Sequence, residues 1–164
     1  MNFLRILLLA LIPLCTPVCL EAAHNQGYVI GISNSNPGNL RAIKWKWWRK
    51  FGATGVDPWH HLIFKSDKDG LKALRYVLQV YGRKGHNTVN KITKRWVGPR
   101  NFEAACDSPL GYRAKLLQDL RVRPNAPLDM NDPKLLATLA KAIVYAENGV
   151  NPYSEKLYKE VFGY

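Results

Sequence analysis

The segment SDKDGLKALRYVLQVYG, residues 66–82, has the pattern of a capped amphipathic helix. Ser66 and Asp69 have the form of a capping box, in which side chains bond the free backbone N–H groups of the first turn. Apolar residues then recur every three or four positions until Gly82, which is typical of a helix with one buried face. This segment is therefore expected to pack its apolar face on a core.

Four further helices are predicted by the same combination of a capping residue, an apolar repeat and a glycine or proline stop. They are TVNKITKRWV from Thr88, PLGYRAKLLQDL after Ser108, PKLLATLAKAIVYAENG after Asp132, and a short last helix from Ser154. No internal repeat or low-complexity segment interrupts them.

Residues 40–64 have a different pattern, rich in aromatic residues and broken by Gly52, Gly55 and an Asp-Pro pair. These signals predict two short extended runs, about 40–48 and 59–64, joined by a long loop. We therefore expect a mainly α (α+β) fold, a single small helical domain with one short β hairpin near its N-terminus.

Residues 1–23 have the composition of a secretory signal peptide. One cation precedes an apolar run, ILLLALIPLC, and small residues at Ala22 and Ala23 suit cleavage. The run contains Pro13 and Pro17 and is shorter than the roughly 20 residues that a membrane span needs. We therefore expect export to the periplasm or the medium, no stable membrane anchor, and a single basic domain over residues 24–164.

Charge and cysteine content describe the exported domain further. Cleavage removes Arg5 and Glu21, one charge of each sign, so the formal net charge stays at +12. It also removes Cys15 and Cys19, so Cys106 is left without a partner for an internal disulfide. A strongly basic exported domain is expected to bind anionic polymers of the cell envelope.

The segment GISNSNPGNLR, residues 31–41, is a polar turn just before the aromatic region. Asn36 and Asn39 carry amide groups that could contact a ligand, Pro37 fixes one dihedral angle, and Gly38 permits a sharp turn or a close approach. A surface turn with no role in binding is the alternative interpretation.

Glu147 is the acid with the strongest case for a chemical role. It ends an apolar helix, where the helix dipole disfavours an anion and so raises the affinity for a proton. Cleavage of a glycoside needs a carboxylic acid that protonates the leaving oxygen. The alternatives are an ion pair with an arginine such as Arg41, or hydrogen bonds to the Asn-rich loop.

The segment KWKWWRK, residues 44–50, interleaves cations with indoles. Such a pattern binds polyanions by charge and stacks on sugars or bases, and it also suits a lipid headgroup layer. Core packing is the alternative, with Trp45 and Trp47 pointing inward from a strand. The candidate binding residues are Arg41, Lys44, Trp45, Trp47, Trp48 and Arg49.

Metal and cofactor chemistry has little support in the sequence. His60 and His61 are neighbours on a predicted strand and would point to opposite faces, so they cannot share a metal through regular geometry. No zinc spacing, serine-hydrolase pattern or phosphate-binding glycine loop is present. We expect no metal and no cofactor.

The order of these motifs resembles a family of bacteriophage virion-associated proteins. The resemblance covers roughly residues 31–153 and rests on SNSNPGNLR, the helix after FKSDKDG, NTVNKITKRWVGP, and the helix ending in AENG. More distantly, the loop and the following elements are similar to lysozyme-like and glucosaminidase-type peptidoglycan hydrolases. The resemblance implies a lysozyme-like domain that acts on the cell wall.

Two departures from these relatives bear on catalysis. Ala146 replaces the histidine of the family's His-Glu-Asn-Gly motif, and the glutamate-bearing helix that precedes the corresponding turn in glucosaminidases is missing. Two functions therefore stay open. One is cleavage of peptidoglycan glycan strands in the manner of a lytic transglycosylase or muramidase, with Glu147 as the single general acid. The other is a non-catalytic module that binds cell-wall glycan or another polyanion, such as nucleic acid or a membrane surface.

Export is directly testable. Protein recovered from outside the cytoplasm is expected to begin near Ala23 or His24, because this boundary separates the apolar run from the first polar loop. N-terminal sequencing measures the start, and an intact Met1 in that fraction would contradict the prediction.

Overall fold

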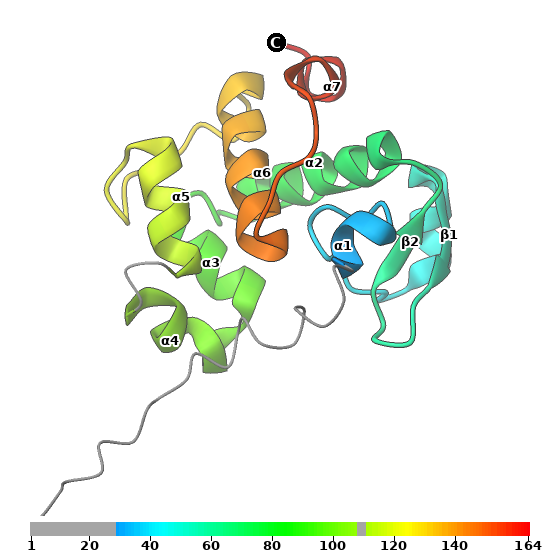
Figure 1. Ribbon diagram of the computed structural model, residues 1–164. Coiled ribbons are helices and arrows are strands. Elements are labelled where there is room, and N and C mark those ends of the chain that lie inside the picture. Colours follow the sequence, from blue (N-terminus) through cyan, green and yellow to red (C-terminus); the bar gives the residue numbers. More distant parts are fainter. Residues whose placement is uncertain (1–28, 108–110) are drawn as a thin grey trace, which may run out of the picture.

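A computed structural model describes residues 29–107 and 111–164 and shows a small, mainly α fold with a two-stranded antiparallel sheet, which confirms the predicted fold class (Figure 1). The predicted signal segment and its two cysteines lie outside the described residues, as does the side chain of Cys106. The α-helices are α1 (Ile30–Ser33), α2 (Asp67–Arg83), α3 (Val89–Val97), α4 (Phe102–Asp107), α5 (Tyr112–Leu120), α6 (Pro133–Asn148) and α7 (Glu155–Phe162). The strands are β1 (Ala53–Val56) and β2 (Leu62–Phe64), and two 3₁₀ helices are η1 (Trp45–Phe51) and η2 (Pro99–Asn101).

The predicted helix starts are confirmed where a polar side chain caps the helix. In α2, α3, α6 and α7, the capping oxygen accepts a hydrogen bond from a backbone N–H of the first turn. The capping residues are Ser66, Thr88, Asp132 and Ser154. Gly149 ends α6 in a left-handed conformation, as predicted.

The segment between α3 and α6 differs from the prediction. α5 begins at Tyr112, and Gly111 takes the extended cap conformation, so the predicted start after Ser108 is wrong. η2 and α4 follow Gly98 and were not predicted. η2 begins after Gly98, with no side-chain cap that could have marked its start in the sequence.

The predicted strand over residues 40–48 is also wrong, because residues 45–51 form the 3₁₀ helix η1. Lys44 has a left-handed backbone, with φ 53°, and turns the chain before it can extend. A 3₁₀ helix has three residues per turn, so Trp45, Trp48 and Phe51 lie on one face. That face packs on a small core formed by Leu40, Ala53, Leu62, Phe64 and Ala73.

The main core surrounds α6, which lies between α5, α2 and α7 (Figure 1). Most of this helix is apolar, and its leucine, alanine, isoleucine and valine side chains are buried nearly all round. A helix that is buried on several sides cannot move without disturbing its neighbours. The C-terminal end of α6, with Glu147, is therefore held in a fixed position.

Gly70 explains how the Asn-rich loop rests on α2. A Cβ atom at this position would lie 1.9 Å from the Ser35 carbonyl oxygen and 2.7 Å from Cδ of Pro37. Only glycine lets the loop approach the first turn of α2 this closely.

Replacing Gly70 by alanine should therefore destabilise the protein by about 2 kcal/mol or more, because the loop or the helix must move. In an ordinary exposed helix the same change would stabilise by about 1 kcal/mol. Urea unfolding measures the difference. Gly55→Ala is the matched control, since its Cβ would meet only Ile63 Cδ1, at 3.8 Å. Equal midpoints for the two variants would contradict the prediction.

Candidate functional site

The Asn-rich loop and the end of α6 are joined directly. Nδ2 of Asn148 donates to the Pro37 carbonyl oxygen at 2.8 Å and to the Val144 carbonyl oxygen at 2.8 Å. Gly31 of α1 packs closely against the same amide, since a Cβ there would lie 2.2 Å from Asn148 Oδ1. The NPGN and AENG segments therefore form one site.

Asn36 supports the loop from inside and does not face a ligand. It is fully buried, and its Nδ2 donates to the carbonyl oxygens of Leu40 and Leu62 at 3.0 and 2.9 Å. Its Oδ1 accepts from the Leu40 N–H at 2.9 Å. The expectation that Asn36 binds substrate is wrong, because its amide is already used to hold the loop on β2.

Gly38 is also interior. A Cβ atom at Gly38 would lie 3.1 Å from Cδ1 of Leu74 and 3.4 Å from Cζ2 of Trp96. The missing side chain therefore lets Leu74 and Trp96 pack closely against the loop backbone. The left-handed positions of the loop are Ser35 and Asn39, with φ 48° and 46°. Gly38 is therefore a packing residue, not a contact for substrate.

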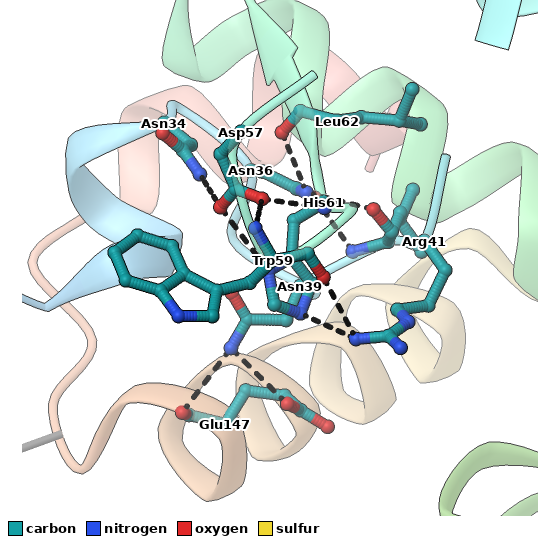
Figure 2. Close-up of polar contacts among 10 residues, drawn as sticks. Asn34, Asn36, Asn39, Arg41, Asp57, Trp59, His61, Leu62 and Glu147 are labelled. Atoms are coloured by element: carbon teal, nitrogen blue, oxygen red, sulfur yellow. Dashed lines mark hydrogen bonds and ion pairs between the residues drawn. The ribbon is translucent and has the colours of Figure 1, made fainter. Parts of the chain in front are cut away.

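Asn39 and Trp96 hold the Glu147 carboxylate from two sides. Nδ2 of Asn39 donates to Glu147 Oε2 at 3.3 Å (Figure 2). Nε1 of Trp96 donates to Oε1 at 2.7 Å. The same Asn39 nitrogen also lies 3.5 Å from the Glu147 carbonyl oxygen. The hydrogen bonds to the Asn-rich loop that were one alternative for Glu147 are thus present, and Glu147 projects from the last turn of α6 toward the loop.

The surroundings of Glu147 favour its protonated form. Burial raises the pKa of this carboxyl, although hydrogen bonds from Asn39 and Trp96 act in the opposite direction. The buried hydroxyl of Tyr112 acts on the same carboxyl but has no hydrogen bond of standard geometry. These neighbours are all uncharged, and the alternative partner Arg41 contacts His61 instead. A carboxyl with a raised pKa and no cation beside it is suited to donate a proton.

The sequence analysis missed Asp57, which organises the turn between the strands. Its Oδ1 accepts from the backbone N–H groups of Trp59 and His61 at 2.9 and 2.7 Å. Its Oδ2 accepts from Asn34 Nδ2 at 2.8 Å and lies 3.2 Å from His61 Nδ1 (Figure 2). Burial alone would raise the pKa of Asp57, but these hydrogen bonds outweigh it and lower the pKa. The Asp-Pro pair that marked the turn could have identified this residue, because aspartate often bonds the backbone two residues ahead.

Arg41 joins this turn to the loop. Its Nη1 donates to the Trp59 carbonyl oxygen at 3.2 Å and lies 3.3 Å from His61 Nε2. The guanidinium is exposed, and the Trp59 side chain is 57% exposed. The backbone of Trp59 is therefore held at its N–H and its carbonyl while its indole faces solvent.

The KWKWWRK segment divides its residues between core and surface. Trp45 and Trp48 are partly buried against the small core, whereas Lys44, Lys46, Arg49 and Lys50 are exposed. Trp47 is 41% exposed, which does not fit the alternative in which it points into the core, and the Lys50 ammonium lies 3.6 Å from its ring centroid. The segment thus presents cations and one indole to solvent.

The two histidines are not on a strand as predicted, since His60 has φ 66° in the turn and His61 forms only an isolated bridge with Arg41. Within residues 29–107 and 111–164, no three metal-ligating side chains gather in one place.

In the same residues, no helix is long and apolar enough to cross a membrane.

Comparison with models of known protein families gives no match, and comparison with curated proteins gives no significant match either. The functional argument therefore depends on the geometry of the site.

The buried carboxyl of Asp57 and the partly buried carboxyl of Glu147 should change stability in opposite directions with pH. The pKa of Asp57 is lowered in the folded state, so its contribution is present above the unfolded pKa and is lost as pH falls through the folded pKa. The pKa of Glu147 is raised, so its contribution is largest in acid and is lost as pH rises through the folded pKa.

Asp57→Asn should therefore cost about 1–3 kcal/mol at pH 7, because charged hydrogen bonds are lost, and the deficit should shrink below about pH 4. Glu147→Gln should gain stability relative to the natural chain as pH rises from 4 to 7. Urea unfolding at several pH values measures both. A parallel pH dependence of the two variants would contradict the assignment.

Proposed function

We propose that the protein cleaves the glycan strands of bacterial cell wall, with Glu147 as the single general acid. The observation that carries the proposal is a partly buried carboxyl with a raised pKa, oriented by Asn39 and Trp96 at a fixed helix end. Hydrolysis of a glycoside begins with a proton transfer of the kind that such a group performs.

The chemistry divides into two proton transfers. Protonated Glu147 gives its proton to the glycosidic oxygen as the bond from the anomeric carbon to that oxygen breaks. In a transglycosylase reaction, a hydroxyl of the same sugar then attacks the anomeric carbon, and the Glu147 carboxylate takes the proton that this hydroxyl loses. The acid is restored, and no second protein carboxylate is required.

Asp57 does not fit the part of a second catalytic carboxylate. Its pKa is lowered, it is 8% exposed, and both its oxygens accept hydrogen bonds that hold the turn. No other acid contributes to the raised pKa of Glu147 among the described residues. This is why the single-acid reaction is favoured over a paired-acid mechanism.

Three groups near the loop suit a sugar substrate, namely the partly buried Asn39 and the exposed Arg41 and Trp59. Asn39 bonds Glu147, and Arg41 bonds the Trp59 backbone. An indole can cover the apolar C–H face of a sugar ring, and amide and guanidinium groups can bond its oxygens. A glycan could therefore extend from Glu147 over this loop and the hairpin turn.

The alternative function is a non-catalytic module that binds the cell wall or another polyanion. The observation that favours it is the exposed set of cations around Trp47, which needs no catalytic group to bind. For either function we also propose that the protein is exported and is related to phage virion proteins, on the basis of its sequence resemblance.

Glu147→Gln decides between the two functions. If the protein is an enzyme, the variant should keep wall binding and lose release of soluble muropeptides by about a hundredfold or more, because the amide cannot donate the proton as an acid. Chromatography of the soluble products from purified peptidoglycan measures this loss.

Glu103→Gln is the matched control, since Glu103 is an exposed acid on α4. It should leave product release unchanged. Wall binding without product release by the natural chain would instead establish the binding module and overturn the catalytic proposal.

A further inference from the structure

A second basic surface, formed by residues other than those of the candidate site, lies at the end of α2 and along α3. A hollow of about 520 Å³ is lined by Lys84, His86, Lys91, Lys94 and Arg95, together with Gly85 and Pro99. The four lysine and arginine side chains are exposed. We call this group the α3 hollow.

The cations of the α3 hollow are not neutralised by acids. Its lining contains no aspartate or glutamate, and none of the four cations forms an ion pair with the described residues. Elsewhere on the surface, Lys68, Lys115 and Lys141 are paired with carboxylates. The excess positive charge of the chain is therefore partly concentrated here.

Helix stability does not account for this arrangement. Lys91, Lys94 and Arg95 occur at helical spacings of three and four, where like charges repel. The helix dipole favours Lys94 and Arg95 in the last turn, but it disfavours Lys91 near the start. Lys91 Nζ is fixed by a hydrogen bond to the Gly85 carbonyl oxygen at 3.1 Å, which keeps its charge at the hollow.

The chemistry of the lining selects a ligand with repeated anionic groups. Lysine and arginine side chains are hydrogen-bond donors only, so they suit phosphates better than the mixed donors and acceptors of a neutral sugar. The lining has one aromatic side chain, His86, which is partly buried and packs against Tyr81 with ring centroids 5.7 Å apart. The hollow therefore lacks the series of aromatic side chains on which successive bases of a single-stranded nucleic acid stack.

We propose that the α3 hollow binds the phosphodiester chain of a polyol-phosphate polymer, as a site separate from the Glu147 site. A concave surface of this size accepts a thin, flexible chain. The proposal does not depend on whether the protein cleaves glycans.

The test compares two variants of equal charge. One replaces Lys84, Lys91, Lys94 and Arg95 by glutamine. The control replaces four exposed cations outside the hollow in the same way, namely Arg121, Lys134, Lys156 and Lys159. Fluorescence anisotropy measures binding of labelled poly(glycerol phosphate) at several salt concentrations.

The hollow variant should bind the polymer at least about tenfold more weakly and with a smaller salt dependence, because fewer counterions are displaced. The control should stay within about twofold of the natural chain. Circular dichroism checks the fold. If the hollow variant does not fold, lysine acetylation of the natural chain replaces it, and polymer should protect Lys84, Lys91 and Lys94 but not Lys156 and Lys159.

Three results would overturn the proposal. An equal loss in both variants would mean that net charge alone attracts the polymer. Equal binding of polyglutamate would mean that phosphate is not selected. Tighter binding of single-stranded DNA, lost in the hollow variant, would assign the hollow to nucleic acid.

Discussion

The side-chain amide of Asn148 joins parts of the chain that are 111 positions apart. Its Nδ2 bonds the Pro37 carbonyl oxygen and, at the same time, its own helix at Val144. Both bonds are buried, so neither partner can exchange them for water without leaving an unsatisfied group. This contact fixes the Asn-rich loop on the end of α6, and the positions of Asn39 and Glu147 depend on it.

Local signals in the sequence predicted those parts of the fold that form by local interactions. The caps at Ser66, Thr88, Asp132 and Ser154 bond N–H groups two or three residues ahead, so a short window of sequence contains both partners. The 3₁₀ helix was missed for a different reason. Its aromatic residues at every third position match neither the two-residue period of a strand nor the 3.6-residue period of an α-helix. The turn before it places Lys44 in the left-handed region, and a lysine in the sequence does not predict that conformation.

The candidate site was only partly predictable, because its members depend on contacts between distant segments. Glu147 could be selected by its place at the end of an apolar helix, and Asn39 by the turn chemistry of its loop. Which loop asparagine faces the acid could not be read from the sequence, since Asn36 and Asn39 belong to the same motif and point opposite ways. Asp57 and Trp96 were missed because their roles come from the hairpin turn and from α3, which meet the loop only in the folded chain.

The two carboxyls of the site differ because their donors differ. Asp57 accepts backbone and side-chain hydrogen bonds on both oxygens, with His61 among the donors, and these lower its pKa despite burial. Glu147 receives one bond from an indole and a longer one from an amide, which do not offset its burial. One carboxylate therefore contributes to the fold as an anion, whereas the other is placed where the proton is favoured. A carboxylate that stabilises the fold as an anion has a lowered pKa, whereas an acid that donates a proton needs a raised pKa. Asp57 and Glu147 have pKa shifts in these two directions. Among the described residues, the groups that act on the Glu147 carboxyl are all uncharged, and this supports the proposed role of that residue in proton transfer.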